Sequence, residues 1–90
     1  MSINIHIHAV HRHLTGDTKL VQTRGASVGE CLAELVKRYP GMNEALFETD
    51  GALKNEIEVY RNMESTFPGE LAEKVKDGDD IHITLILAGG

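Results

Sequence analysis

Cysteine is almost missing from this chain of 90 residues, and tryptophan is missing altogether. The one cysteine, Cys31, has no partner within the chain, so no disulfide scaffold can hold the fold together. No apolar run comes near the roughly 20 residues that a membrane-spanning helix needs. The first residues also lack the basic and apolar stretches of a signal peptide. These absences predict a cytoplasmic protein without a membrane segment.

Basic residues are scarce as well. Nine Lys and Arg residues stand against fourteen Asp and Glu residues, which gives a formal net charge of −5. Without a basic cluster the chain is not expected to bind nucleic acid, and a basic protein surface is the more natural partner. The hydrophobic content of 41% is that of an ordinary folded protein, and the length predicts one domain over residues 1–90.

Four segments have the pattern of β-strands. In the first, isoleucines at Ile3, Ile5 and Ile7 alternate with polar residues, as in a half-buried strand. A polar turn containing Gly16-Asp17 joins it to the second strand, and so short a connection predicts an antiparallel hairpin. The predicted strands cover residues 2–10, 18–24, 56–61 and 80–87.

One helix is expected over about residues 27–39. Ser27 and Glu30 have the spacing of a capping box, and apolar residues then recur every three or four positions as far as Tyr39. Pro40 with the following glycine ends the helix. Cys31 falls on the apolar stripe, which predicts a small buried hydrophobe rather than a reactive thiol.

The segments between these elements are predicted less regularly. Residues 43–47 have the composition of a helical turn, and residues 62–69 are expected to form a loop. Residues 70–75 suit either a short helical turn or a strand. Asp77-Gly78-Asp79 predicts a tight turn before the last strand, and its acidic residues lack the spacing of a calcium-binding EF-hand.

The order of elements predicts an α+β fold. The first and last strands are the most apolar, so we expect them to be central neighbours, made parallel by a right-handed crossover through the helix. One helix with one apolar stripe can cover one face of a mixed sheet of four or five strands. This is the β-grasp, or ubiquitin-like, roll.

The end of the chain carries a more specific resemblance. The turn Asp77-Gly78-Asp79, the apolar last strand and Ala88-Gly89-Gly90 resemble the sulfur-carrier branch of the ubiquitin-like proteins. That branch includes the small subunit of molybdopterin synthase and the thiamine-pathway sulfur carrier. The length favours the molybdopterin type or its cysteine-pathway relative. Many molybdopterin-type members carry a proline where Leu85-Ile86-Leu87 stands here, so the pathway stays open.

The resemblance implies a carrier protein rather than an enzyme. A partner adenylating enzyme would use ATP to activate the carboxylate of Gly90, and a sulfur donor would convert it to a thiocarboxylate. The sulfur would then pass to a sulfur-accepting synthase in cofactor or cysteine biosynthesis, with the molybdopterin type favoured. Gly89 and Gly90 would form the loaded end and Leu87 and Ala88 would present it, as a flexible tail over residues 87–90. No bound cofactor or metal is implied, and the free protein is expected to be a monomer.

Histidines mark a candidate docking surface. His6 and His8 lie on the strand face opposite the isoleucines, and His82 lies on the strand expected beside it. Such a group can bind Zn²⁺ or Ni²⁺, or it can belong to the face that docks partner proteins, which is the reading we favour. Val10 and Ile86 are expected to add an apolar patch to this face.

Two other functions remain open at this point. In a ubiquitin-like modifier the same activated Gly90 would end on a lysine of another protein. In a non-catalytic interaction module of the same fold the terminal glycines would have no chemical role.

Overall fold

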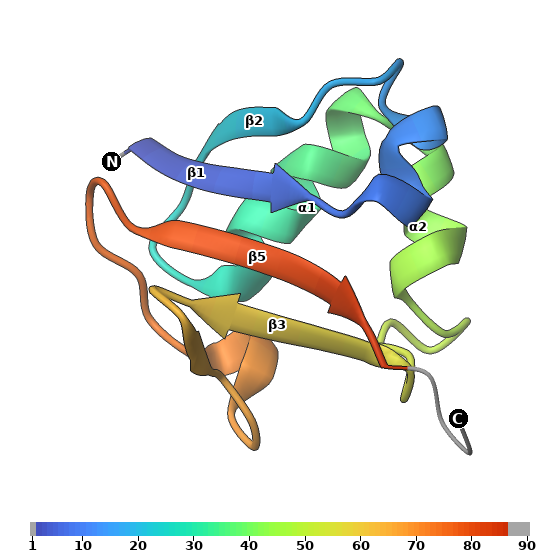
Figure 1. Cartoon of the computed structure of the whole chain (residues 1–90). Helices are drawn as coiled ribbons and strands as arrows, with labels where there is room; N and C mark the ends of the chain where they lie inside the picture. The colour runs from blue at the N-terminus through green and yellow to red at the C-terminus, as the bar shows by residue number, and fades with distance from the viewer. Residues whose placement is uncertain (1, 87–90) are drawn as a thin grey trace.

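The protein is built in two layers, with helices packed on one face of a five-stranded sheet (Figure 1). The computed structural model describes residues 2–86. The strands are β1 (Ser2–Ile7), β2 (Leu20–Arg24), β3 (Ile57–Arg61), β4 (Glu64–Ser65) and β5 (Asp80–Leu85). The helices are α1 (Val28–Arg38), α2 (Gly41–Leu46) and the two 3-10 helices η1 (Ala9–Leu14) and η2 (Glu70–Ala72). None of the helices within this described part has the length and apolarity needed to cross a bilayer.

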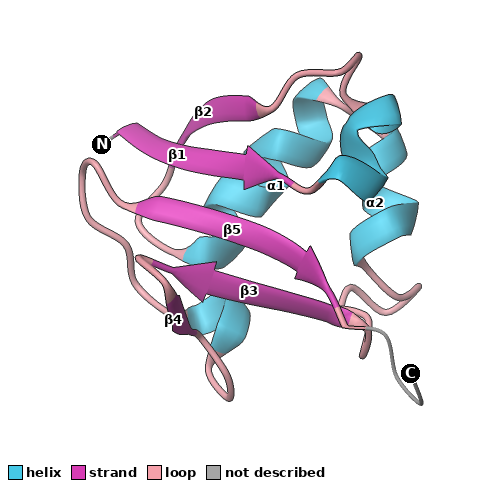
Figure 2. Cartoon of the chain, viewed as in Figure 1, coloured by secondary structure: helices cyan, strands magenta, loops and turns pink. Residues whose placement is uncertain are grey.

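The sheet has the mixed topology expected from the sequence. Its strand order is β2-β1-β5-β3-β4, so β1 and β5 are inner neighbours (Figure 2). They run parallel, with Ile5 opposite Ile81, whereas β1 with β2 and β5 with β3 are antiparallel. The prediction of a β-grasp roll with one main helix is therefore confirmed.

The core lies between the sheet and α1. Alternation turns every second residue of β1 toward the helix, and α1 meets them with the apolar stripe that its sequence predicts. Removing this apolar surface from water is the main source of stability for a chain without disulfides. The residues that are fully buried here include Ile3, Ile5, Val28, Leu32, Leu35, Met42, Leu46 and Ile81.

The capping box of α1 is formed as predicted. The backbone N–H of Glu30 donates to Ser27 Oγ over 3.2 Å, and Glu30 Oε1 accepts from the backbone N–H of Ala26 over 3.1 Å. The first bond satisfies a donor that the first helical turn leaves unpaired, and the second ties the Glu30 side chain to the residue before the N-cap, Ser27. The helix ends at Arg38 before Pro40, but the chain resumes as α2, where only a helical turn over residues 43–47 was expected.

The first strand is shorter than predicted. β1 ends at Ile7, and η1 begins two residues later, although the sequence pattern predicts a strand to residue 10. His8 causes the change, because its Nδ1 accepts the backbone N–H of Val10 over 3.1 Å and caps the 3-10 helix. Val10 therefore lies on η1 and not on the sheet. His11, expected in an open turn, is instead buried.

A fifth strand, β4, lies within the segment predicted as a loop. It pairs with β3 through Tyr60 opposite Ser65. The hairpin turns at Asn62-Met63, whose φ angles of 51° and 70° give the left-handed turn that matches strand twist. Residues 70–75, for which a helical turn or a strand was open, begin with the helical turn η2, and Lys74 then forms an isolated antiparallel β-bridge with Ser27. The predicted tight turn is confirmed at Gly78, whose φ of 87° suits glycine.

Candidate functional site

The described part of the chain ends just beyond β5. The backbone N–H of Ile86 donates to the carbonyl oxygen of Glu56 over 2.6 Å, and its side chain is exposed. The residues predicted to carry and present sulfur follow it, and all four lie outside the described residues: Leu87, Ala88, Gly89 and Gly90. Their roles stay predictions.

The face of the sheet that points away from α1 is open. A row of side chains crosses four strands there, because the register sets His6 opposite Leu20 on one side and opposite His82 on the other. Tyr60 continues the row beyond His82. Next to it, Tyr60, Met63, His82 and Thr84 line a shallow, largely apolar hollow of about 220 Å³. We call this surface the open sheet face; an apolar band of this kind is typical of a protein interface.

His6 and His82 stack at the centre of the open sheet face. Their ring centroids are 4.1 Å apart and the rings are within 3° of parallel. His6 Nε2 lies 2.9 Å from Asp80 Oδ1, and this hydrogen bond, followed by one from Asn4, lowers the pKa of the Asp80 carboxyl. Burial lowers the pKa of His82, and His6 lowers it further. The Nδ1 atom of His82 is buried without a hydrogen-bond partner among residues 2–86.

This stack is poorly arranged for metal binding. The lone pairs of imidazole nitrogens lie in the plane of the ring, so two parallel stacked rings do not direct them at one ion. His8 does not complete a site either, since its Nδ1 is taken by the cap of η1. Within residues 2–86 no three histidine, cysteine or acidic side chains are grouped as metal ligands. The arrangement fits a surface for protein contact better than a chelate.

The predicted docking residues are only partly brought together. His6 and His82 meet on the open sheet face, and His8 lies at its end. Val10 and Ile86 are both exposed, but Val10 lies on η1 and Ile86 follows β5, so they are not members of one strand face. The sequence prediction missed the apolar residues that do lie on this face, Leu20, Tyr60 and Met63. The alternation of the second and third predicted strands was the available signal for the first two.

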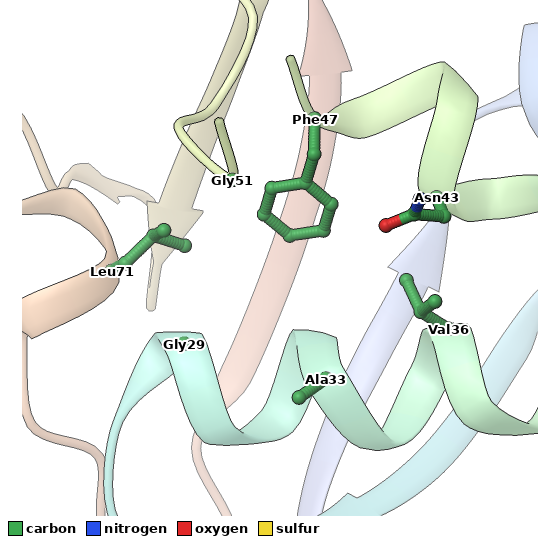
Figure 3. Close-up of a pocket in the computed structure, with 7 residues that line it drawn as sticks. All are labelled: Gly29, Ala33, Val36, Asn43, Phe47, Gly51 and Leu71. Carbon is green, nitrogen blue, oxygen red and sulfur yellow. The ribbon is translucent and has the colours of Figure 1, made fainter. Parts of the chain in front are cut away.

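A second hollow lies on the helix side of the molecule. Figure 3 shows Phe47 and Leu71 facing the outer surface of α1 across it. Its volume is about 360 Å³. Its lining residues are Gly29, Ala33, Val36, Asn43, Phe47, Gly51 and Leu71, none of which is ionisable. The hollow therefore offers shape but no acid, base or nucleophile.

The one thiol is not placed for chemistry. Cys31 is fully buried on the inner side of α1, as its position on the apolar stripe predicts. Burial raises the pKa of this thiol, which keeps it protonated and weakly nucleophilic at neutral pH. Cys31 is a packing residue.

Comparison with known proteins identifies relatives over the whole chain. A family model described as the ThiS family matches residues 5–90. The sulfur carrier protein CysO of Mycobacterium tuberculosis is 32% identical, and the match covers 100% of both chains. A chain in the crystal structure of the Amycolatopsis orientalis BexX/CysO complex is 35% identical, with a TM-score of 0.88 over 98% of this chain and 99% of that one. SAMP1 from Haloferax volcanii is 28% identical, with a TM-score of 0.87 over 100% of both chains.

Proposed function

The chain belongs to the ThiS family of ubiquitin-like sulfur carriers, and from this premise we propose that it carries sulfur as a thiocarboxylate on Gly90. The observation that supports this most is the end-to-end match to a protein named as a sulfur carrier. The relative matched over its whole length is a sulfur carrier by name, and the chain shares its fold with a chain of the BexX/CysO complex. The terminal Ala88-Gly89-Gly90, on which the resemblance was first based, supplies the group to be loaded.

The proposed chemistry needs a partner because a carboxylate is a weak electrophile. An α-carboxyl group is ionised at neutral pH, and its charge repels a nucleophile. An oxygen of the Gly90 carboxylate attacks the α-phosphorus of ATP, and pyrophosphate leaves. A sulfur nucleophile of the sulfide oxidation level then attacks the acyl carbon of the resulting adenylate, and AMP leaves with the oxygen. The carrier keeps one C–S bond in place of one C–O bond.

Two terminal glycines suit this transfer. The adenylating enzyme has to enclose the carboxylate so that water does not hydrolyse the adenylate. A tail without Cβ atoms passes through a narrow channel and reaches backbone conformations that other residues avoid. Gly89 and Gly90 give the chain such an end.

We propose that this carrier is of the cysteine-pathway type. Sequence analysis favoured the molybdopterin type, but the carriers to which the chain is similar at 32% and 35% identity are both called CysO. The departure at Leu85-Ile86-Leu87 from the proline of many molybdopterin-type members points the same way. The sulfur acceptor would then be an enzyme of cysteine biosynthesis.

We further propose that the open sheet face docks the adenylating enzyme and the sulfur-accepting enzyme. The BexX/CysO complex is a case in which a similar carrier is bound to another protein. The band from Leu20 to Tyr60 lies on β1, β2, β3 and β5, and the chain leaves β5 toward Gly90. Docking through this face would bring the tail and the partner's active site together.

The test is to load the protein in vitro. The chain is incubated with its adenylating enzyme, ATP and a sulfide source, and intact-mass spectrometry should show the exchange of one oxygen for one sulfur. Gly90→Ala and a variant without Gly90 should keep the wild-type circular dichroism spectrum and fail to load. Loading of the shortened variant to the wild-type level would refute the proposal.

A protein modifier is the second candidate, and one comparison favours it. The 28% identical relative from Haloferax volcanii is also called small archaeal modifier protein 1. The activation step would be the same, and an isopeptide bond from Gly90 to a lysine would replace the thiocarboxylate. Tagged protein isolated from cells under denaturing conditions distinguishes the two, because only a modifier gives lysine-linked adducts that Gly90→Ala abolishes.

A further inference from the structure

β1 and β5 run side by side to their ends, and the chain turns from β1 into η1 there (Figure 1). A basic hollow lies at this place. Its volume is about 410 Å³, and no acidic side chain lines it. Five of its nine lining residues have basic side chains: His6, His8, Arg12, Lys19 and His82. The chain as a whole has a net charge of −5, whereas the lining of this hollow holds Arg12 and Lys19 and no acidic side chain. We call these five residues and the space between them the basic hollow.

The backbone of Ile7 binds the side chain of Arg12 and the main chain of Lys19. Arg12 Nε donates to the carbonyl oxygen of Ile7 over 3.1 Å, and the backbone N–H of Ile7 donates to the carbonyl oxygen of Lys19 over 2.8 Å. The guanidinium of Arg12 and the main chain of Lys19 are thereby held beside the end of β1, and the Lys19 side chain extends from this anchored backbone. This link uses one N–H of the guanidinium group and leaves the two terminal nitrogens, which can bind the two oxygens of an anion side by side.

Neither cation is neutralised by an acidic side chain. The ion pairs among residues 2–86 join His6 to Asp80, Arg38 to Glu34 and Arg61 to Glu73, and none includes Arg12 or Lys19. Asp80, the acidic residue beside the histidine stack, already accepts from His6 and Asn4. A half-buried guanidinium without a counter-ion is therefore available to an external anion.

Two histidines add to the donor set. His8 Nδ1 accepts the backbone N–H of Val10, so the proton of the neutral ring is on Nε2, which is a donor. His82 lines the same hollow, and its buried Nδ1 has no partner among the described residues. Buried polar atoms in native proteins are nearly always hydrogen-bonded, so this unpaired nitrogen is an exception beside the hollow.

We propose that the basic hollow binds one oxyanion group, held between Arg12 and Lys19 with His8 as a further donor. Phosphate, sulfate and a carboxylate share the required chemistry, namely two or more oxygens that carry a delocalised negative charge. The group has two possible sources, a free inorganic anion or an acidic side chain of a partner docked on the open sheet face. The second source depends on the proposed function, whereas the site itself does not.

The sequence predicted that His6, His8 and His82 share a face but did not add Arg12 and Lys19 to them. The five basic residues stand at positions 6, 8, 12, 19 and 82, and no sequence pattern places Arg12 and Lys19 beside the three histidines. Only the parallel pairing of β1 with β5 and the turn into η1 bring them together.

The experiment is a titration of the ¹⁵N-labelled free protein with sodium phosphate, followed by NMR. Sodium chloride at equal ionic strength is the reference, because it reports screening alone. We expect saturable shifts at Arg12 Nε–H, Lys19 and His82 with phosphate and not with chloride. Arg12→Gln should weaken phosphate binding at least about tenfold, because it removes a guanidinium group that can form two charged hydrogen bonds to the anion.

Two more variants separate a loss of phosphate binding from a loss of folding: Lys19→Gln as a second binding variant and Arg24→Gln as a control. Lys19 is tied to Ile7 through its backbone, so Lys19→Gln should keep the fold and still weaken phosphate binding several-fold. Arg24 is exposed at the other end of β2 and pairs with Ser2, so Arg24→Gln is the matched control and should bind like wild type. Equal shifts with chloride, or unchanged affinity in Arg12→Gln and Lys19→Gln, would overturn the proposal.

A kinetic arm identifies the source of the anion. Loading by the adenylating enzyme is measured for the Arg12→Gln and Arg24→Gln variants at several carrier concentrations. A several-fold higher KM for the Arg12 variant alone, at unchanged kcat, would assign the anion to an acidic side chain of the enzyme. Equal KM values would assign it to a free oxyanion, and either result is consistent with the site. If wild-type protein fails to load at all, the Gly90 proposal fails and the phosphate titration still decides the oxyanion site.

Discussion

The imidazole rings of His6 and His82 lie face to face, 4.1 Å apart, across the parallel pair of β1 and β5. Register imposes this contact, because the two residues are direct partners on the open side of the sheet. Asp80 supports only His6, through a hydrogen bond of 2.9 Å. The pair is thus asymmetric. The His6 ring is hydrogen-bonded to a carboxylate, whereas the buried Nδ1 of His82 has no hydrogen-bond partner among residues 2–86.

This asymmetry predicts that mild acid destabilises the protein. Burial lowers the pKa of His82 and of His11 below their ordinary value of 6.5. Below that pH the unfolded chain therefore binds more protons than the folded one. Stability is complete above about pH 6.5 and falls as the pH drops toward the lowered values. Urea midpoints measured at about pH 7.5 and pH 5.5 should show this loss.

His82→Gln and His11→Gln should each make the urea midpoint less dependent on pH. Each variant removes one group whose protonation the folded state resists. Gln22→Ala, on the same sheet but without a titrating group, should keep the wild-type dependence. If both histidine variants lose stability with acid as steeply as wild type, the explanation is wrong.

The cap of α1 gives a local stability prediction. Ser27→Ala removes the acceptor for the backbone N–H of Glu30 and should lower the free energy of unfolding by about 1 kcal/mol. Ser27→Asp restores an acceptor and adds a negative charge near the helix N-terminus, so it should recover most of the loss. Urea unfolding at pH 7.5 measures both. Equal destabilisation by the two variants would show that the cap does not contribute.

The strands and the main helix could be predicted from the sequence, because the spacing of their apolar residues directly reflects which face of each element is buried. Ile3, Ile5 and Ile7 alternate because β1 has one buried face, and α1 has a stripe because it lies on that face. The central pairing of β1 with β5 was predicted because these are the two most apolar strands.

The elements that the sequence did not predict depend on single local contacts. Alternation continues through Val10, and only the His8 side chain, by capping η1, ends the strand at Ile7. β4 has two residues and follows a left-handed turn at Asn62-Met63, which lacks the glycine that usually signals such a hairpin. The composition of the open sheet face depends on register across four strands, which no single segment encodes.

Cys31 should not react in the folded protein. It is fully buried and burial raises the pKa of its thiol, so a thiol reagent such as Ellman's reagent should label it only after unfolding. Sulfur transfer in vitro should therefore be unaffected by Cys31→Ala, although that variant should lose about 1–2 kcal/mol of stability through lost packing. Rapid labelling of native protein, or loss of loading in a folded Cys31→Ala variant, would contradict this assignment.

Met63 is the residue through which docking on the open sheet face can be tested with least risk to the fold. Its side chain is 77% exposed and lines an apolar hollow with Tyr60 and His82. Its φ of 70° is one that aspartate tolerates better than most residues. Met63→Asp should therefore keep or improve stability while placing a charge in the apolar hollow beside Tyr60 and His82.

We expect Met63→Asp to raise the KM for loading by the adenylating enzyme about tenfold, since a few apolar side chains packed into pockets carry much of the binding energy of an interface. Phe67→Asp is the matched control, because Phe67 is comparably exposed at 71% but does not line that hollow. It should load with the wild-type KM. The maximal rate should be unchanged in both variants, because neither substitution alters Gly90. Equal effects of the two substitutions would mean that exposed apolar area in general, and not the open sheet face, determines how the partner binds.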